Sequence, residues 1–96
     1  MNKKELVDAL SQRADLGSRA VAADVLNAVL DTITSAVAGG DRVNITGFGV
    51  FEKHSRPERQ ARNPATGETI TVPADAVPRF RPGADFKAAV NVDGLR

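Results

Sequence analysis

The chain has 96 residues, a hydrophobic share of 42% and a charged share of 26%, which is the composition of one small globular domain. Four Phe and no Trp or Tyr leave few large side chains for a core, so the core is thin for a monomer. The absence of cysteine excludes disulfides, thiolate metal sites and cysteine nucleophiles. The formal net charge of +1 alone says nothing about a polyanionic partner.

The charge is unevenly distributed along the chain. Residues 1–52 carry five bases and seven acids, whereas residues 53–81 carry six bases and three acids, a local balance of +3. Residues 82–96 are balanced. The near-neutral total therefore conceals a basic middle segment.

We expect neither an export signal nor a membrane span. Glu5 and Asp8 lie where a signal peptide needs its apolar stretch, and nowhere do eighteen apolar residues run together. Together with the lack of cysteine, this predicts an intracellular protein.

Two helices are predicted in the first forty residues. Apolar residues on one face predict a short helix over residues 3–13, and Ser18 is the expected N-cap of a longer helix over residues 19–38. Gly39 and Gly40 end the second helix. The apolar stripe of this helix is wide, so the helical hairpin needs a sheet or another chain as cover. The stripe consists of Val21, Ala22, Val25, Leu26, Val29, Leu30, Ile33 and Val37.

Strands and a last helix follow. Residues 43–51 alternate in polarity around Gly47, which predicts a β-hairpin. A second extended run over residues 69–80 is predicted to be interrupted by Pro73 and Pro78, and these prolines are typical of an edge strand. Residues 83–92 predict a short terminal helix.

The basic segment between the strands is predicted to be extended. Pro57 would cost a helix interior about 3 kcal/mol, so the three-residue spacing of the bases does not indicate a helix. In a flat strand Arg56 and Arg62 share a face and Arg59 does not, unless a bulge or strong twist near Pro57 intervenes. The bases are Lys53, Arg56, Arg59 and Arg62.

Residues 63–67 supply turn chemistry, so the segment is expected to fold back as a two-stranded ribbon with Pro64 near its tip. Such a ribbon is marginally stable alone, and we expect it to be mobile until something binds it. Arginines along it suit bidentate contacts to phosphate, and an exposed proline ring at the tip can wedge between base pairs. The alternatives are a solvated charged loop and an ordinary turn proline.

Three motifs, GFGVFE over residues 47–52, RNPATGE over 62–68 and VPRFRPG over 77–83, together resemble the HU/IHF family of bacterial DNA-architectural proteins. The resemblance runs through nearly the whole chain. It implies an α+β fold: a helical hairpin, a three-stranded antiparallel sheet extended into a β-ribbon arm, and a short C-terminal helix, assembled as an intertwined homodimer.

The same resemblance implies one domain over residues 1–96. Residues 1–46 form the helical dimerisation hairpin and first strand, residues 47–83 form the sheet, whose DNA-binding arm covers about 53–76, and residues 84–96 form the last helix and tail.

The resemblance also implies roles for individual residues. The arm arginines line the minor groove, Asn63 and Pro64 act at the kink, and Lys3 and Arg81 contact flanking backbone. The expected DNA-binding residues are Lys3, Lys53, Arg56, Arg59, Arg62, Asn63, Pro64, Arg79, Arg81 and Lys87. The expected dimer-interface residues are Leu26, Leu30, Ile33, Phe48, Phe51 and Phe80.

The chain departs from the family pattern where relatives carry lysines. Glu68 stands in the arm, and Ala84 and Asp85 open the last helix. These changes remove positive charge and predict a weaker hold on DNA that flanks the arms.

The function implied is sequence-tolerant binding and bending of double-stranded DNA in a cytoplasmic nucleoid, with bent, nicked or junction DNA and RNA as further forms. The alternatives are a sequence-preferring factor of the IHF type and a dimeric assembly module that binds RNA or an acidic protein. An enzyme is not expected, because His54 is the only histidine and has no nucleophile or metal-ligand pattern around it. We likewise expect no cofactor, metal, small-molecule substrate or membrane partner.

Overall fold

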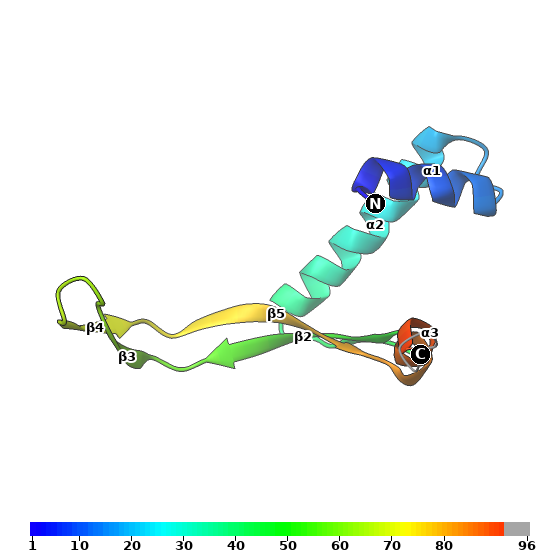
Figure 1. The fold of residues 1–96 in the computed structure, drawn as a ribbon. Coiled ribbons are helices and arrows are strands. Elements are labelled where there is room, and N and C mark those ends of the chain that lie inside the picture. Colours follow the sequence, from blue (N-terminus) through cyan, green and yellow to red (C-terminus); the bar gives the residue numbers. More distant parts are fainter. Residues whose placement is uncertain (92–96) are drawn as a thin grey trace. The chain divides into compact units, whose positions relative to one another are not determined.

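The computed structural model describes residues 1–91 and contains three helices and five strands (Figure 1). The α+β class, the helical hairpin, the sheet and the ribbon arm are confirmed. The second extended run is interrupted at Pro73 as predicted, where Pro73 and Ala74 divide it into two strands, but contrary to the prediction it is not interrupted at Pro78. In chain order the elements are α1 (Lys3–Arg13), α2 (Arg19–Ala38), β1 (Val43–Ile45), β2 (Gly49–Arg56), β3 (Arg59–Arg62), β4 (Thr69–Val72), β5 (Asp75–Pro82) and α3 (Ala84–Asn91).

The chain divides into two compact units, the first of which ends at Ser35 within α2. This unit begins with a capping box: Asn2 Oδ1 accepts from the Glu5 N–H at 2.9 Å, and Glu5 Oε1 accepts from the Asn2 N–H at 3.3 Å. Ser18 caps α2 as predicted, since its Oγ accepts from the Val21 N–H at 3.2 Å. An ion pair between Asp8 of α1 and Arg19 of α2 joins the two helices.

Glycine residues end α2 at its C-terminus. Gly40 has a φ of 90°, a left-handed conformation that glycine adopts without side-chain strain. The Gly40 N–H donates to the Val37 carbonyl at 3.0 Å and the Asp41 N–H donates to the Ala36 carbonyl at 2.9 Å. This is a Schellman motif, which satisfies carbonyls at the helix end and turns the chain toward β1.

By length and composition α2 could cross a membrane, but this criterion alone does not test the expectation of no membrane span, which stays a prediction. Its 20 residues include an 18-residue window with a mean hydropathy of 1.4, of which 11% is buried. Asp24 and Asp31 lie within the helix, and a carboxylate near the bilayer centre costs about 2.5–3.5 kcal/mol. The core helix of a soluble protein meets the same criterion, so it is weak evidence for a membrane span.

The second unit contains an antiparallel sheet in the order β1-β2-β5. Phe51 at its centre pairs with Val43 on one side and Phe80 on the other. The Phe51 and Phe80 rings lie 4.7 Å apart between centroids, and Phe48 stacks on Phe86 of α3 at 4.8 Å. All four phenylalanines thus form one cluster between the sheet and α3.

Two glycines of the GFG sequence make this cluster possible. Gly47 has a φ of 83° in the turn between β1 and β2, and its carbonyl accepts from the Phe86 N–H at 3.1 Å, which anchors α3. Gly49 is buried, and a Cβ there would lie 2.5 Å from the Phe80 ring and 2.7 Å from the Arg81 carbonyl oxygen. The close approach of β2 and β5 therefore requires glycine at position 49.

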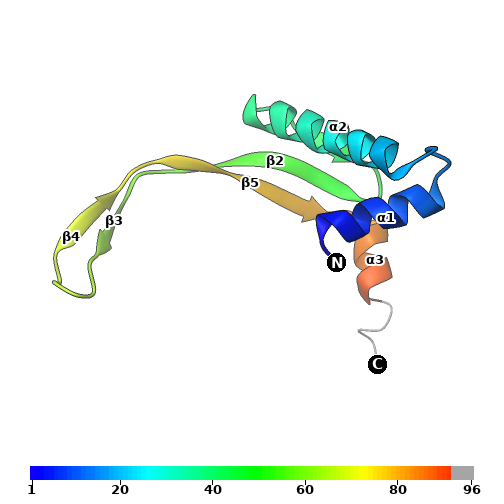
Figure 2. The ribbon, with the colours of Figure 1, turned by 90° about the horizontal axis from the view of Figure 1, so that it is seen from above.

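The arm continues the sheet without a change of register. β2 and β5 pair as far as Arg56 and Asp75, and β3 and β4 resume with Arg59 opposite Val72 (Figure 2). The gap is two residues long on each strand, and each side of it contains a proline, Pro57 or Pro73, which cannot donate to the ladder. Neither strand contains an inserted residue. Of the two features predicted as alternatives near Pro57, a bulge and a strong twist, the bulge is therefore excluded.

Few apolar side chains are buried. Among residues 1–91 the buried hydrophobic residues are Val7, Ala22 and Val37. On α2, Val21, Val25 and Val29 are each 44–48% exposed at four-residue spacing, which places them on one stripe. An uncovered apolar stripe on a helix of this length indicates a protein interface.

We predict that Gly49→Ala destabilises the fold by about 1–3 kcal/mol, because the added methyl group displaces the Phe80 ring or the backbone of β5. Thermal unfolding at fixed protein concentration measures the loss, and the NMR signals of the Phe80 ring report the displacement. The matched control is Gly40→Ala, where the conformation is strained but a Cβ meets nothing within 4 Å. It should leave the Phe80 signals in place, and wild-type stability in Gly49→Ala would contradict the packing argument.

Candidate nucleic-acid interface

The β2–β5 pair has two chemically different faces. Because strand residues alternate in direction, Glu52, His54 and Arg56 lie on the face opposite Phe51. Their cross-strand partners on this polar face are Arg79, Val77 and Asp75, and Arg81, which pairs with Val50, lies on the same face. Three predicted DNA-binding arginines, Arg56, Arg79 and Arg81, therefore share one surface.

Arg56 and Asp75 form the last rung of this ladder. Arg56 Nε donates to Asp75 Oδ1 at 2.8 Å and Nη2 donates to Oδ2 at 2.6 Å, a bidentate ion pair. The hydrogen bonds from Arg56 lower the pKa of Asp75 below its usual value, and those to Asp75 raise the pKa of Arg56. Both side chains are about half exposed, so the pair meets solvent.

The other two arginines of the polar face also have internal partners. Arg81 Nε pairs with Glu52 Oε1, and Glu52 is the more buried member at 21% exposure. Arg79 Nη1 lies 3.2 Å from His54 Nδ1. A guanidinium has only donors, so Nδ1 can take part in this contact only as the acceptor. Each arginine of the face thus has a neighbour that neutralises it or accepts from it.

Lys53 lies apart from these arginines. It shares the face of Phe51, and its Nζ donates to the Ala38 carbonyl at 3.3 Å. A cation at the last carbonyls of a helix interacts favourably with the helix dipole, so Lys53 stabilises the end of α2. The structure does not bring Lys53 together with Arg56.

The arm presents two further arginines. Arg59 lies on one face with Val72 opposite it, and Arg62 lies on the other face. Both are exposed, and neither takes part in an ion pair within residues 1–91. Gln60 and Thr71 bond across the ribbon at 3.3 Å. The arm arginines are thus accessible to phosphate.

The tip of the arm is organised by Asn63. Its side-chain Oδ1 accepts from the Ala65 N–H at 2.9 Å, and its carbonyl accepts from the Gly67 N–H at 2.7 Å. Gly67 has a φ of 76°, as the turn chemistry predicts. Pro64 is exposed between these bonds, and Asn63 fixes the turn that presents its ring.

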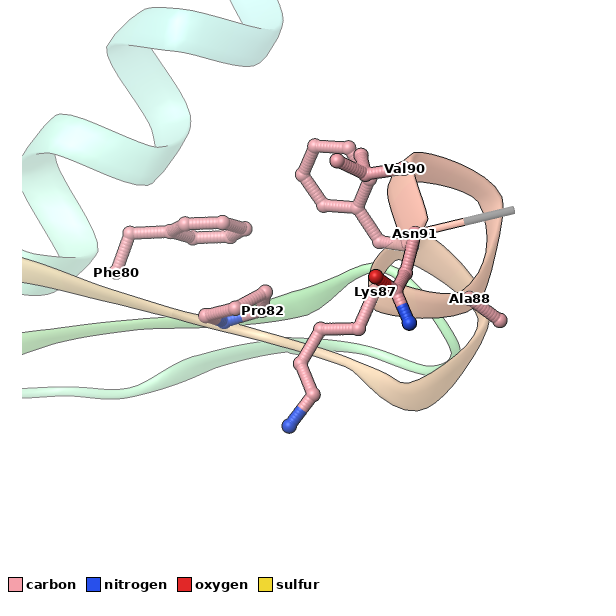
Figure 3. A pocket seen from close by; sticks show the side chains of 7 residues that line it. Phe80, Pro82, Lys87, Ala88, Val90 and Asn91 are labelled. Atoms are coloured by element: carbon pink, nitrogen blue, oxygen red, sulfur yellow. The ribbon is translucent and has the colours of Figure 1, made fainter. Parts of the chain in front are cut away.

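Two predicted lysines lie outside the arm. Lys3 opens α1 and is exposed. Lys87 lies on α3 beside an open, mainly apolar hollow of about 580 Å³, where Phe80 and Pro82 of β5 lie across from Val90 (Figure 3). Because Phe80 is 37% exposed, this hollow leaves part of the aromatic cluster uncovered.

The predicted interface residues are also partly uncovered. Leu30 and Phe48 are 42% and 43% exposed, and Leu26, Ile33 and Phe51 are half-buried.

Within residues 1–91 no group of three His, Asp or Glu side chains is placed to hold a metal ion.

Sequence reasoning missed two acids of the polar face, Glu52 and Asp75, as partners of arginines. Asp75 lies 19 positions from Arg56, and no local pattern connects them. The turn from Asn63 to Gly67 could have revealed this pair. The turn sets which residues of the two strands lie opposite each other, and continuing that register away from the tip places Arg56 opposite Asp75.

Comparison with known sequences identifies relatives. The profile of the family described as "Bacterial DNA-binding protein" matches residues 1–91. DNA-binding protein HU 2 of Streptomyces coelicolor is 54% identical over 91 residues, which cover 95% of this chain and 41% of that protein. The chain thus spans less than half the length of the Streptomyces relative. DNA-binding protein HU-beta of Neisseria meningitidis is 46% identical over 90 residues, covering 94% of this chain and all of that protein.

Solved structures give the same relationship. A cocrystal structure of Anabaena HU with DNA has a TM-score of 0.86 and 46% identity, and the match covers 94% of this chain and 97% of that one. HU from Thermotoga maritima has a TM-score of 0.65 and 32% identity, covering 94% and 98%.

We predict that Arg56→Gln raises the pKa of Asp75 toward that of an ordinary aspartate, measured from the carboxyl ¹³C signal of Asp75 against pH. Because the pKa of Asp75 is lowered in the folded state, the pair stabilises the fold above the ordinary aspartate pKa. That contribution is lost as the pH falls through the lowered value. Arg62→Gln is the control that removes an arm charge far from Asp75, and identical titration midpoints in all three proteins would contradict the ion pair.

Proposed function

The chain belongs to the HU family of bacterial DNA-binding proteins, and from this premise we propose that it binds double-stranded DNA with little regard to sequence and bends it. The observation that carries the proposal is the ribbon arm, on which the exposed Arg59 and Arg62 lead to an exposed Pro64. The resemblance to the Anabaena HU–DNA cocrystal structure supports it.

The arm residues act in two ways. Arg59 and Arg62 contact phosphate and the walls of the minor groove, because guanidinium groups bind phosphate in a bidentate, permanently charged manner. Pro64 partly replaces the stacking between two base pairs and so kinks the duplex. A bend of 40–90° costs about 1–6 kcal/mol by smooth elastic estimates, which the phosphate contacts offset. Contacts to backbone carry no sequence information, which accounts for the tolerance of sequence.

We further propose that two chains form an intertwined homodimer with two arms. The support is the uncovered stripe of α2 and the partly exposed Phe48 and Phe80, which a second copy would bury. In this assembly residues 1–46 provide the helical dimerisation hairpin and the first strand, and residues 47–83 provide the sheet and arm. Residues 84–96 provide the C-terminal helix and tail, of which residues 92–96 lie outside the described residues. The proposed interface residues are Leu26, Leu30, Ile33, Phe48, Phe51 and Phe80.

Contacts beyond the arms extend the DNA-binding surface. Arg79 and Arg81 lie on the polar face of the sheet, whereas Lys3 and Lys87 lie on helices. We propose that these residues contact flanking backbone and that the protein acts on the nucleoid in the cytoplasm. Lys53, which bonds to the end of α2, contributes through the general positive field.

We predict a steep dependence of DNA affinity on salt. A dimer that neutralises roughly six phosphates should show log K falling with log salt at a slope of about −5. Fluorescence anisotropy with a random-sequence duplex at several salt concentrations measures the slope. A slope shallower than about −2 would contradict the electrostatic picture, and a preference of 10³-fold or more for one selected duplex would favour the IHF type.

Pro64→Ala should lose bending more than affinity, since the variant keeps the arm arginines and removes the wedge. Energy transfer between dyes at the two ends of a short duplex measures bending in the same titration. Arg62→Ala is the matched variant and should weaken binding to all sequences alike while the residual complex stays bent. Unchanged bending by Pro64→Ala would exclude the wedge, and absence of duplex binding at low salt would favour the assembly module.

A further inference from the structure

The base of the arm holds an acid directly against a DNA-binding arginine. Asp75 engages the Nε and Nη2 edge of Arg56 across the last rung of the β2–β5 ladder. Beyond this rung Pro57 and Pro73 interrupt the ladder. Arg56 is therefore held by a carboxylate at the point where the sheet gives way to the arm.

We propose that Asp75 is a built-in competitor for DNA phosphate at Arg56, and that breaking this ion pair is a step of binding that weakens the affinity for DNA. The proposal rests on the DNA-binding function proposed above. It makes Asp75 a residue that acts through Arg56, since the carboxylate is expected to leave the guanidinium when phosphate arrives.

The exposure of the pair allows the exchange. The Arg56 and Asp75 side chains are 54% and 47% exposed, so water already competes for both. Exposed ion pairs contribute little net stability, whereas a duplex presents one phosphate about every 1.7 Å along its axis. The high density of phosphate around the arm favours transfer of the guanidinium from carboxylate to phosphate.

The charge of Asp75 also favours breaking of the ion pair when DNA binds. If the pair persisted in the complex, a carboxylate would remain beside the DNA backbone and its charge would be repelled. Arg59 also lowers the pKa of Asp75, so both arginines nearest to this carboxylate are ones that phosphate would attract. Loss of these partners beside phosphate should raise the pKa of Asp75 when DNA binds.

The other acids near the arm are placed differently. Glu52 pairs with Arg81 but is largely shielded from solvent, so it belongs to the packing of the sheet. Glu58 at the base of the arm and Glu68 near its tip form no ion pair within residues 1–91. Glu68 is therefore the matched acid for a control, because its removal changes the arm charge equally without releasing an arginine.

The test is Asp75→Asn, which keeps the side-chain size and removes the charge. We expect DNA affinity to rise about three- to tenfold at moderate salt, and the salt slope to steepen by about 2 for a dimer, since two additional guanidinium groups each neutralise one phosphate. Glu68→Gln should raise the affinity with a smaller change of slope. Thermal unfolding of each variant shows whether the fold is retained.

A double-mutant cycle shows whether Asp75 acts through Arg56. In the Arg56→Gln background, Asp75→Asn should lose most of its effect on affinity and slope. In wild-type protein the carboxyl ¹³C signal of Asp75 should report a higher pKa in the complex with a short duplex than in the unbound protein. Both results together would support the proposal.

Other outcomes would overturn it. Weaker binding by Asp75→Asn would mean that the carboxylate presents Arg56 to DNA instead of competing for it, and equal effects of Asp75→Asn with and without Arg56 would reduce it to a general charge effect. A wild-type protein that binds duplex with a steep salt slope would leave the proposed function intact in either case. Absence of duplex binding by the wild type would overturn both.

Discussion

The shortage of places to bury apolar side chains is the constraint on which the other features depend. Only small side chains, those of Val7, Ala22 and Val37, are buried among the hydrophobic residues of the described chain, and the stripe on α2 and the aromatic cluster remain partly open to solvent. Apolar surface of this extent is stable in water when another surface covers it. In the proposed homodimer a partner copy satisfies this need and also supplies a second arm. Under that proposal the requirement for assembly and the capacity to hold DNA at two points have one physical origin.

The side chains of the arm, by contrast, are not fixed by packing. Its strands are held by the β3–β4 ladder, a Gln60–Thr71 bond and the turn around Asn63. A two-stranded ribbon of this kind adapts to a curved partner because little buried surface is lost when it bends. The prolines at its base remove ladder donors at adjacent positions of the two strands, so adaptation is concentrated where the arm leaves the sheet.

Local chemistry made much of the fold predictable. The N-cap at Ser18, the glycine end of α2, the hairpin at Gly47 and the turn before Gly67 each depend on a few neighbouring residues, and each was confirmed. The pairing of Arg56 with Asp75 depends on register across 19 positions, and Lys53 was grouped with the arm bases although strand alternation places it on the aromatic face. The mean hydropathy of α2 was not predicted, because the membrane expectation rested on unbroken apolar runs, whereas alanine and valine raise the mean hydropathy of this helix despite two aspartates.

The unbroken register of the ribbon also limits how such an arm can change in length. Adding one residue to a single strand would turn every side chain beyond it to the opposite face. One residue added to each strand would keep the pairing but turn the tip over, so Asn63 and Pro64 would point to the opposite side. Lengthening that preserves the direction of the tip requires two residues on each strand, a step of roughly 7 Å. The arm can therefore change in reach only in such steps, and under the proposed function the distance between kinks in bound DNA would change in the same steps.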